Sequence, residues 1–538
     1  MKRRQFLKSA AGAAVAGTAV LRESPAQAAT STNPLMELRY RRLVPEIFGT
    51  LADAPDDSPV VIIGSGFGGA VAAWRLAQAG IRSTVLERGS RWPIPSSTRA
   101  IFSPDSGYDG RAFWRRNGST NTTGLGVGAD YFGGVLDIVA FDGIDVMRAA
   151  AVGGGSIVYT GAHPLPSRSA FGQVFGDALD YDEMLTRWYP LAANTLGTST
   201  MPDDIYGSKA YRHSRIWDAQ ATKAGYTSTP IPGIWDWEVM RAELSGDVRA
   251  SATIGESNYG NANGVKRGLQ MTYLKYAEES GLSTVYPGHE VLDVGVDADG
   301  RYIVDVQKVD PTGTVLSRRT ITASRLVMAA GSIGTTELLM RARKSGALPN
   351  LNTYVGTGWG TNGDAYLTRG SGTVGIAQGA ASASMVSGVV KGLPVTLENW
   401  YVGGLPIQLG VVGSLGMTLD DRRADFGLSS AGRLTLKWSG QADSTAALVK
   451  LNKKIASASS VGTSVWPLPE AIDTFTAHPL GGVVLGKATD GYGRVVGHPG
   501  LYVMDGALVP GNAGAVNPSI TITALAERNI ARIIADGV

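Results

Sequence analysis

The residue best suited to acid–base chemistry in this sequence is a histidine near the C-terminus. The chain has five histidines, and His478 lies in the stretch TAHPLGG, directly before Pro479 and shortly before the pair Gly481-Gly482. An imidazole gains and loses its proton near neutral pH, so it can act as a general base or a general acid. Proline and glycine allow a tight, fixed loop around it. A loop histidine that is merely hydrogen-bonded is the alternative, and this stretch alone does not decide between the two.

Composition excludes several other kinds of site. The chain has no cysteine, so it has no disulfide, no thiolate nucleophile and no cysteine-based metal site. His213, His289 and His498 do not stand at metal-ligand spacings from one another or from carboxylates. We therefore predict that the protein binds no metal.

A glycine-rich turn near the N-terminus predicts a nucleotide-binding unit. The sequence PVVIIGSGFGGAVAAWRLAQAG indicates a buried strand, a turn with Gly64, Gly66 and Gly69, and a helix. These glycines make the turn, let backbone N–H groups approach a pyrophosphate, and let helix and strand pack closely. The next strand ends at Glu87, 23 residues after Gly64, where a carboxylate can accept both ribose hydroxyls of an adenosine. The unit alone does not distinguish NAD from FAD, although Glu87 disfavours NADP.

Three later segments add to this unit. The stretch AVGGGSIVYTGAHP places Gly153–Ser156 in a loop whose backbone must approach a flat or anionic group. Residues 324–342 predict a core strand and then a helix capped by the region of Thr335, Thr336 and Glu337. Residues 501–534 predict a strand, an acidic turn at Asp505-Gly506, a loop to Asn517 and a helix whose N-terminus is rich in Ser and Thr.

In this order the motifs resemble the glucose–methanol–choline (GMC) oxidoreductase family and, within it, the bacterial cholesterol oxidases. The resemblance runs from about residue 58 to the C-terminus. It is strongest in GSGFGGAVAAWRLAQAG, VGGGS, AAGSIGTTELLMRARKSGALPNLN, GWGTNG, HPLGG, LGKATDGYGRV and LYVMDGALVPG, and in NPSITITALAERN. It implies an FAD enzyme in which hydride leaves the carbinol carbon of an alcohol for flavin N5, and O2 reoxidises the flavin to give a carbonyl product and hydrogen peroxide.

The resemblance also implies roles for individual residues. His478 and Asn517 match the catalytic histidine and asparagine beside the flavin, so the imidazole would accept or orient the hydroxyl proton and the amide would steady the forming carbonyl. The backbone of Val291 would pair with adenine, although Val291 could instead be an ordinary strand residue. Asp505 would contact FAD, although it could instead be a carboxylate that forms a turn. The expected FAD-binding residues are Gly64, Gly66, Phe67, Gly69, Glu87, Gly155, Ser156, Tyr159, Val291, Asp505, Gly506 and Asn517.

The sequence departs from the cholesterol oxidases at several positions. Their cavity carboxylate, which isomerises the steroid, falls near Val389, and the next carboxylate, Glu398, matches a non-catalytic family position. We therefore expect no isomerisation. Tyr159 stands in place of an asparagine near the flavin, where it could pack as a wall, the favoured interpretation, or offer its hydroxyl. Tyr159 and Thr160 occupy the positions nearest to the histidine that binds FAD covalently in other members, and His163 lies just beyond, so we predict non-covalent FAD.

The predicted fold class is α/β. A discontinuous Rossmann-like FAD domain would comprise residues 55–165, 265–350 and 475–538, and an α+β substrate domain with a mostly antiparallel sheet would comprise residues 166–264 and 351–474. Strands near 395–440, including GRLTLKW, would cover the flavin. The turn-rich residues 93–135 would form either a lid or a plain surface loop.

The first 28 residues predict export. They combine a basic start, a short apolar run and Ala26-Gln27-Ala28 as a cleavage signal, and Arg3-Arg4 resembles the twin-arginine class. They also hold five positive charges and one negative charge, so the formal net charge of +3 becomes about −1 without them. We therefore expect a secreted protein without a nucleic-acid partner or a stable membrane span; oligomeric state is not predicted.

The leading prediction is a secreted FAD-dependent alcohol oxidase whose partners are O2 and a small alcohol, either sterol-like or smaller. The alternatives are a cholesterol oxidase with isomerase activity, an FAD dehydrogenase that uses another electron acceptor, and a flavoprotein that binds an apolar ligand without converting it.

Overall fold

The strand, glycine turn and helix expected after residue 57 are present, and the strand, β1, lies at the centre of the larger sheet. The computed structural model describes residues 34–538 except 97, 106, 116–129, 376, 402–409 and 464–468. Strand β1 (Asp57–Ile63) leads through the glycine turn into α3 (Phe67–Gln78), and β2 (Ser83–Leu86) follows parallel to β1. The run from Val60 to Ile63 is buried on both faces, as is usual for a parallel strand.

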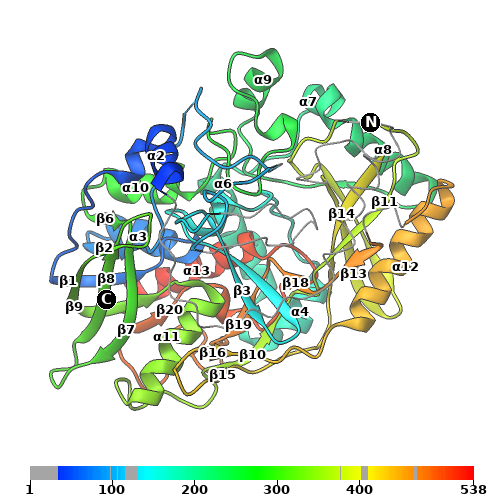
Figure 1. Ribbon diagram of the computed structural model, residues 1–538. Coiled ribbons are helices and arrows are strands. Elements are labelled where there is room, and N and C mark those ends of the chain that lie inside the picture. The colour runs from blue at the N-terminus through cyan, green and yellow to red at the C-terminus, as the bar shows by residue number, and fades with distance from the viewer. Residues whose placement is uncertain are drawn as a thin grey trace.

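This sheet has the order β6-β2-β1-β9-β8-β7, with β20 paired to β9. The strands β6, β2, β1, β9 and β20 pair in parallel, whereas β7, β8 and β9 form an antiparallel meander. Helices α3, α10 and α13 pack together beside the sheet (Figure 1). The bounds are β6 (Ser283–Tyr286), β7 (His289–Val296), β8 (Tyr302–Val309), β9 (Val315–Met328), β20 (Leu501–Val503), α10 (Tyr273–Glu279), α11 (Gly331–Ser345) and α13 (Ser519–Ala535).

A second sheet of six strands forms the other side of the molecule (Figure 1). Its order is β17-β11-β14-β13-β12-β5, and all of its pairs are antiparallel. Trp217 of α8 and Leu448 of α12 pack into its apolar core. The bounds are β5 (Thr229–Pro230), β11 (Ala365–Gly370), β12 (Ser384–Val390), β13 (Leu393–Trp400), β14 (Val411–Thr418), β17 (Ala471–Ile472), α8 (Arg212–Lys223) and α12 (Ala442–Ala458).

Three small sheets link the larger ones. Strands β3 and β4 form a hairpin that pairs with β18, β10 pairs with β19, and β15 pairs with β16. Their bounds are β3 (Leu136–Phe141), β4 (Ile144–Ala149), β10 (Thr357–Gly360), β15 (Gly427–Leu428), β16 (Leu434–Thr435), β18 (Phe475–Thr476) and β19 (Leu480–Gly482). The remaining α-helices are α2 (Pro34–Leu43), α4 (Arg168–Phe175), α5 (Tyr181–Glu183), α6 (Tyr189–Leu196), α7 (Asp203–Gly207) and α9 (Trp237–Ser245).

The α/β class and the mostly antiparallel second sheet are confirmed. The strands of the larger sheet come from the segments predicted for the FAD domain, and those of the six-stranded sheet come from the segments predicted for the substrate domain. The domain boundaries themselves stay a prediction. Among the residues that the structure describes, no helix combines the length and apolar character needed to cross a bilayer. The expected signal, residues 1–28, lies outside the described part of the chain.

Three local expectations are wrong or met only in part. Helix α11 begins at Gly331, so Thr335 and Thr336 lie inside it, although Thr335 Oγ1 accepts the backbone N–H of Ala330, the residue before the helix (3.1 Å). The segment GRLTLKW contributes only β16, which pairs with β15 outside the six-stranded sheet. Residues 101–105 and 107–114 form neither a lid nor a surface loop, because most of them are buried, several in an aromatic cluster with Tyr40 and Trp92. Residues 116–129 lie outside the described part.

Candidate active site

His478 lies between two short strands that belong to different sheets. Strand β18 ends at Thr476 and pairs with β4, whereas β19 begins at Leu480 and pairs with β10. Gly481 and Gly482 have φ of 90° and 103°. A Cβ on Gly481 would lie 2.3 Å from the carbonyl oxygen of Gly358, so only glycine fits. The expected tight loop is therefore present and fixes His478 at both ends.

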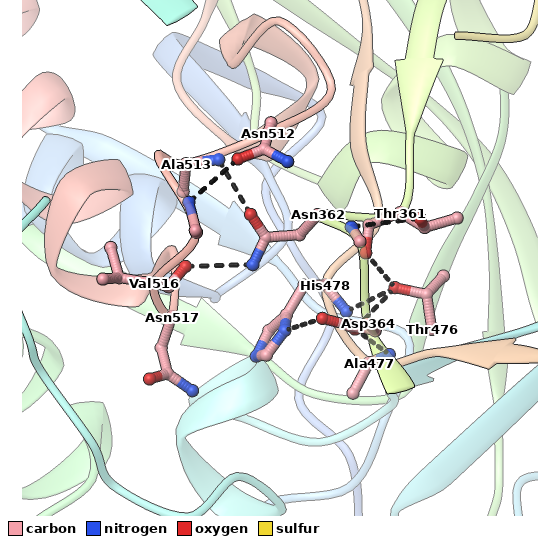
Figure 2. Close-up of polar contacts among 12 residues, drawn as sticks. Thr361, Asn362, Asp364, Thr476, Ala477, His478, Asn512, Ala513, Val516 and Asn517 are labelled. Atoms are coloured by element: carbon pink, nitrogen blue, oxygen red, sulfur yellow. Dashed lines mark hydrogen bonds and ion pairs between the residues drawn. The ribbon is translucent and has the colours of Figure 1, made fainter. Parts of the chain in front are cut away.

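A buried carboxylate holds one side of the His478 ring. The Nδ1 of His478 lies 2.8 Å from Oδ1 of Asp364, which is fully buried (Figure 2). The other Asp364 oxygen accepts hydrogen bonds from Thr476 Oγ1 (2.8 Å) and from the Ala477 backbone N–H (3.1 Å). Because a carboxylate can only accept, Nδ1 carries the proton and Nε2 is left as the acceptor nitrogen.

The environment of His478 favours its protonated form. Burial alone would lower the pKa of His478, but the charge and hydrogen bond of Asp364, with the charge of Glu398, outweigh burial and raise the pKa above its usual value. The imidazolium that forms when His478 takes a proton is thus stabilised by carboxylates already in place.

Asn517 ends the loop that precedes α13, and it is buried. Its Nδ2 donates a long hydrogen bond of 3.5 Å to Glu398 Oε2, and its Oδ1 has no partner. The loop is held by Asn362, whose Nδ2 donates to the carbonyl of Val516 (2.9 Å) and whose Oδ1 accepts from the N–H of Ala513 (2.8 Å). Figure 2 shows that the segment from Thr361 to Asp364 contacts both the His478 loop and the Asn517 loop. One tight turn thus positions two residues that are distant in the sequence.

Glu398, which was expected to match a non-catalytic position of the family, also belongs to this cluster. It lies on β13, is fully buried, and its Oε1 has no hydrogen-bond partner. Burial raises the pKa of Glu398 to about 7, although the charge of His478 and the hydrogen bond from Asn517 oppose the shift. A carboxylate between Leu397 and Asn399, in a run expected to form a strand, was the available sequence signal, because an acidic residue in a buried strand needs a reason to be there.

His478 and Asn517 face one cavity of about 290 Å³. Phe67 and Gly155 from the glycine-rich loops line the same cavity, so the nucleotide-binding turn and the His–Asn pair share it. Most of the other lining side chains are apolar or aromatic. They include Leu136, Met147, Tyr159, Tyr259, Tyr366, Trp400, Tyr401, Leu415, Phe475 and Ile522.

Tyr159 forms part of the cavity wall. Its ring packs edge-on against Phe67 with the centroids 5.5 Å apart, and its hydroxyl lies 3.1 Å from Nε2 of His163. The other nitrogen of His163 lies 2.9 Å from Thr198 Oγ1. The hydroxyl of Tyr159 is therefore engaged inside the protein, in agreement with the packing interpretation.

The glycine turn has the shape of a phosphate cradle. Gly66 caps the N-terminus of α3, and a Cβ placed on it would meet no atom within 4 Å, so open space lies over the turn. A Cβ on Gly69 would lie 2.1 Å from the carbonyl oxygen of Gly64, which agrees with the predicted close packing of helix and strand. Backbone N–H groups at a helix N-terminus that faces open space suit a pyrophosphate.

Glu87 is buried beside this turn. Its Oε2 accepts from the backbone N–H (3.2 Å) and the Oγ (2.7 Å) of Ser65, and its Oε1 accepts from the N–H of Gly89 (2.9 Å). Val291 lies close by on β7, because the N–H of His289 donates to the carbonyl of Glu87. Glu87 thus lies at the end of β2, where the adenosine was expected, and Val291 lies two residues beyond the residue of β7 that bonds to it.

Two other expected FAD-binding residues have their polar groups engaged within the protein. Ser156 does not line the cavity: its Oγ donates to the Gly153 carbonyl (2.7 Å) and accepts from the Leu269 N–H (3.0 Å). Asp505 accepts hydrogen bonds from Ala507, Gly331 and Thr335, as a turn-forming carboxylate would, and its contact with FAD stays a prediction. Gly506 follows directly in the same buried turn.

No three histidine, aspartate or glutamate side chains gather as metal ligands would in the part of the chain that the structure describes. The polar residues around His478 instead form pairs suited to moving and holding a proton.

Comparison with known proteins gives consistent matches. Residues 432–526 match the family model described as GMC oxidoreductase, and residues 62–112 match that of an NAD(P)-binding Rossmann-like domain. The chain is 26% identical to a cholesterol oxidase from Acinetobacter baumannii, over 89% of this chain and 94% of that one. It is also 26% identical to a cholesterol oxidase from Mycobacterium tuberculosis, over 88% and 90% of the two chains.

Two solved structures show the same fold at lower identity. Pyridoxine 4-oxidase from Mesorbium loti superposes with a TM-score of 0.60 at 16% identity, over 89% of this chain and 99% of that one. A fungal aryl-alcohol oxidase also superposes with a TM-score of 0.60, at 13% identity, over 90% of this chain and 100% of the other.

Proposed function

We propose that this chain, a member of the GMC oxidoreductase family, is an FAD-dependent oxidase of alcohols. The observation that carries the proposal is the meeting of His478 and Asn517 on one cavity with Phe67 and Gly155 of the glycine-rich loops. A base, an amide and a nucleotide cradle on one mostly apolar cavity suit the removal of a proton and a hydride from a carbinol.

The residues present fit FAD. The open space over Gly66 suits the pyrophosphate, the unpartnered Oδ1 of Asn517 suits a bound ligand or cofactor, and Glu87 stands at the adenosine end. FAD, when bound, supplies the hydride acceptor and passes the electrons on to O2.

The chain's own residues bind and deprotonate the alcohol. We assign Nε2 of His478 as the acceptor of the hydroxyl proton, because Asp364 holds the proton on Nδ1. Asn517 positions the substrate oxygen through its carboxamide. The aromatic wall that includes Tyr159 and Trp400 excludes water from the reacting groups.

The test of this function combines anaerobic and aerobic measurements. Under argon, an alcohol substrate is expected to bleach the flavin absorbance of the holoenzyme, and admission of air is expected to restore it with one H2O2 released per carbonyl formed. Bleaching without peroxide would indicate a dehydrogenase that uses another acceptor. Absence of bleaching by every alcohol of a panel of sterols, aliphatic alcohols and diols would refute the proposal.

We further propose that FAD is bound without a covalent link. His163, the histidine nearest to the position used for covalent attachment in other members, has both ring nitrogens in hydrogen bonds, and burial lowers its pKa to about 3. Precipitation of the holoenzyme with trichloroacetic acid is therefore expected to release all of the flavin into the supernatant, as measured by its absorbance. Yellow colour retained in the washed pellet would contradict this.

The cavity supports an alcohol smaller than a sterol, without isomerisation. A volume of about 290 Å³ lies at the lower end of the range for drug-sized ligands, and residues of the cofactor cradle share it. Val389 is 71% exposed on the β12–β13 hairpin, and Glu398 does not line the cavity. When sterols are tested in the same panel, we expect no conjugated enone product.

Export through the twin-arginine route also stays a proposal. It is supported by Arg3-Arg4 and by the cleavage signal before Thr30. Replacing both arginines with lysine should leave the protein inside the cells, as measured by immunoblots of culture medium and cell fractions.

A further inference from the structure

The cavity contains a second polar group besides His478 and Asn517. Asp105 and Asn258 line it, together with the rings of Tyr259 and Tyr401. Asp105 comes from the segment that follows Ile101, Asn258 from the loop after Ile254, and Tyr401 from the end of β13. Asp105 is only 7% exposed, and among the described residues it has no arginine or lysine as a hydrogen-bonded partner, although the charge of Lys266 acts on it. A carboxyl group buried among aromatic rings is costly unless a partner uses it.

The hydrogen bonds at this group run in one direction. The hydroxyl of Tyr401 donates to Asn258 Oδ1 (2.7 Å), and Asn258 Nδ2 donates to Asp105 Oδ2 (2.8 Å). The backbone N–H groups of Asn258 and Ser257 also point at Oδ2, at 3.4 and 3.5 Å. The chain of donors from Tyr401 through Asn258 ends on Asp105, so this group offers the cavity an acceptor. A ligand that binds there must supply a donor.

The charges near Asp105 favour a neutral donor. Lys266 is buried nearby, and its Nζ donates to the Tyr159 carbonyl (2.7 Å) and to Ser257 Oγ (2.9 Å). Burial raises the pKa of Asp105 to about 7 and lowers that of Lys266 to about 7, and each group opposes the shift of the other. A neutral hydroxyl therefore suits this position better than an ammonium group, because the ammonium would lose its hydration among the aromatic rings, beside a carboxyl group whose ionised form burial disfavours.

We propose that Asp105, oriented by Asn258 and Tyr401, binds a second hydroxyl group of the substrate, so that the preferred substrates are alcohols with a further hydroxyl remote from the reacting one. This rests on the proposed alcohol oxidase function, because the reacting hydroxyl is the one that His478 and Asn517 receive. The aromatic rings between the two polar groups would contact the apolar part that joins the hydroxyls.

Binding to the reduced holoenzyme tests the subsite apart from turnover. The flavin is first reduced with dithionite, so that no hydride can be accepted, and dissociation constants are measured by calorimetry at pH 7 under argon. The probes are 1-alkanols, α,ω-diols and ω-amino-1-alkanols with four to ten carbons. At the chain length that spans the cavity, we expect the diol to bind about tenfold more tightly than the matching 1-alkanol and more tightly than the amino alcohol.

Two variants and a matched control test whether the preference for diols depends on Asp105 and Tyr401. Asp105→Asn keeps the shape but removes the charge, so the diol and the 1-alkanol should then bind within about twofold of each other. Tyr401→Phe leaves Asn258 without its donor and should reduce the preference about threefold. Asp420→Asn neutralises another buried carboxyl, one that accepts from Ser444 and does not line the cavity, and it should leave the preference unchanged.

The outcomes separate the subsite from the function. A diol preference that survives Asp105→Asn, no preference at any chain length, or tighter binding of amino alcohols would each overturn the proposal. If Asp105→Asn does not fold, an undiminished preference in Tyr401→Phe would overturn it instead. Failure of every alcohol to bleach the oxidised enzyme would refute the oxidase function, whereas the calorimetry would still decide on the subsite.

Discussion

Replacing His478 with alanine is expected to slow anaerobic flavin reduction by a factor of roughly 10² to 10⁴, with FAD still bound in full. Among the described residues that line the cavity, His478 is the one histidine, and its Nε2 is held as an acceptor because Asp364 occupies Nδ1. Without it, the hydroxyl proton must leave to water, which the aromatic wall excludes. Stopped-flow absorbance of the flavin under argon measures the rate constant, and the absorbance of the purified protein measures FAD content.

Two further variants make this result specific. His478→Gln keeps an N–H donor for the buried Asp364, so it tests loss of the base without leaving that carboxylate unpaired. His498→Ala removes another mostly buried loop histidine that does not line the cavity, and it should reduce flavin at the normal rate. A rate constant for His478→Gln within a few-fold of the wild-type value would remove His478 from the mechanism.

The nucleotide cradle was predictable because its signals are local. One strand–turn–helix–strand unit contains Gly64, Gly66, Gly69 and Glu87. Its glycines are needed for the turn and for the close packing of helix and strand within the unit. The structure confirms the expected strands and helix. The sequence could not show that Ser156 and Asp505 use their polar atoms inside the protein, because their partners Leu269 and Thr335 come from other segments.

The pairing of His478 with Asn517 came from family resemblance, and their supporting residues were missed. Asp364 is 114 residues from His478, and Glu398 is 119 residues from Asn517. In the sequence TNGDAY, Asp364 looks like an ordinary turn residue exposed to water, yet it is fully buried. Only the tertiary fold, which brings the turn before β11 under the loop after β18, reveals its contact.

The two interpretations of residues 93–135, a lid and a surface loop, failed for a similar reason. Residues 93–135 are rich in glycine, serine and asparagine, and this composition is typical of exposed loops. The interspersed Phe102, Tyr108 and Phe113 instead pack with Tyr259 and Trp92 in a buried cluster. Aromatic residues without helical or strand periodicity give no local signal of burial.

Asp364→Asn is expected to lower kcat/KM about tenfold to a hundredfold and to move the acidic limb of its pH profile to lower pH. His478 must be neutral to accept a proton, so kcat/KM falls as the pH drops below the pKa of His478. In the wild-type protein Asp364 outweighs burial and raises that pKa, whereas in the variant burial dominates and the pKa falls below its usual value. The rate falls at the plateau as well, because an amide can turn its NH2 toward Nδ1 and leave the proton on Nε2.

The pH dependence of kcat/KM between pH 5 and 9, measured by oxygen uptake, separates this positioning role from a loss of folding, which would lower the plateau without shifting the limb. Asp425→Asn is the matched control, because Asp425 accepts the backbone N–H of Gly358 (2.9 Å) near the same loop without contacting His478. Its profile should coincide with that of the wild-type protein. If the acidic limb of Asp364→Asn stays in place or moves to higher pH, Asp364 does not control the protonation of His478. Burial and Glu398 would then account for the pKa of His478 in the wild-type protein as well.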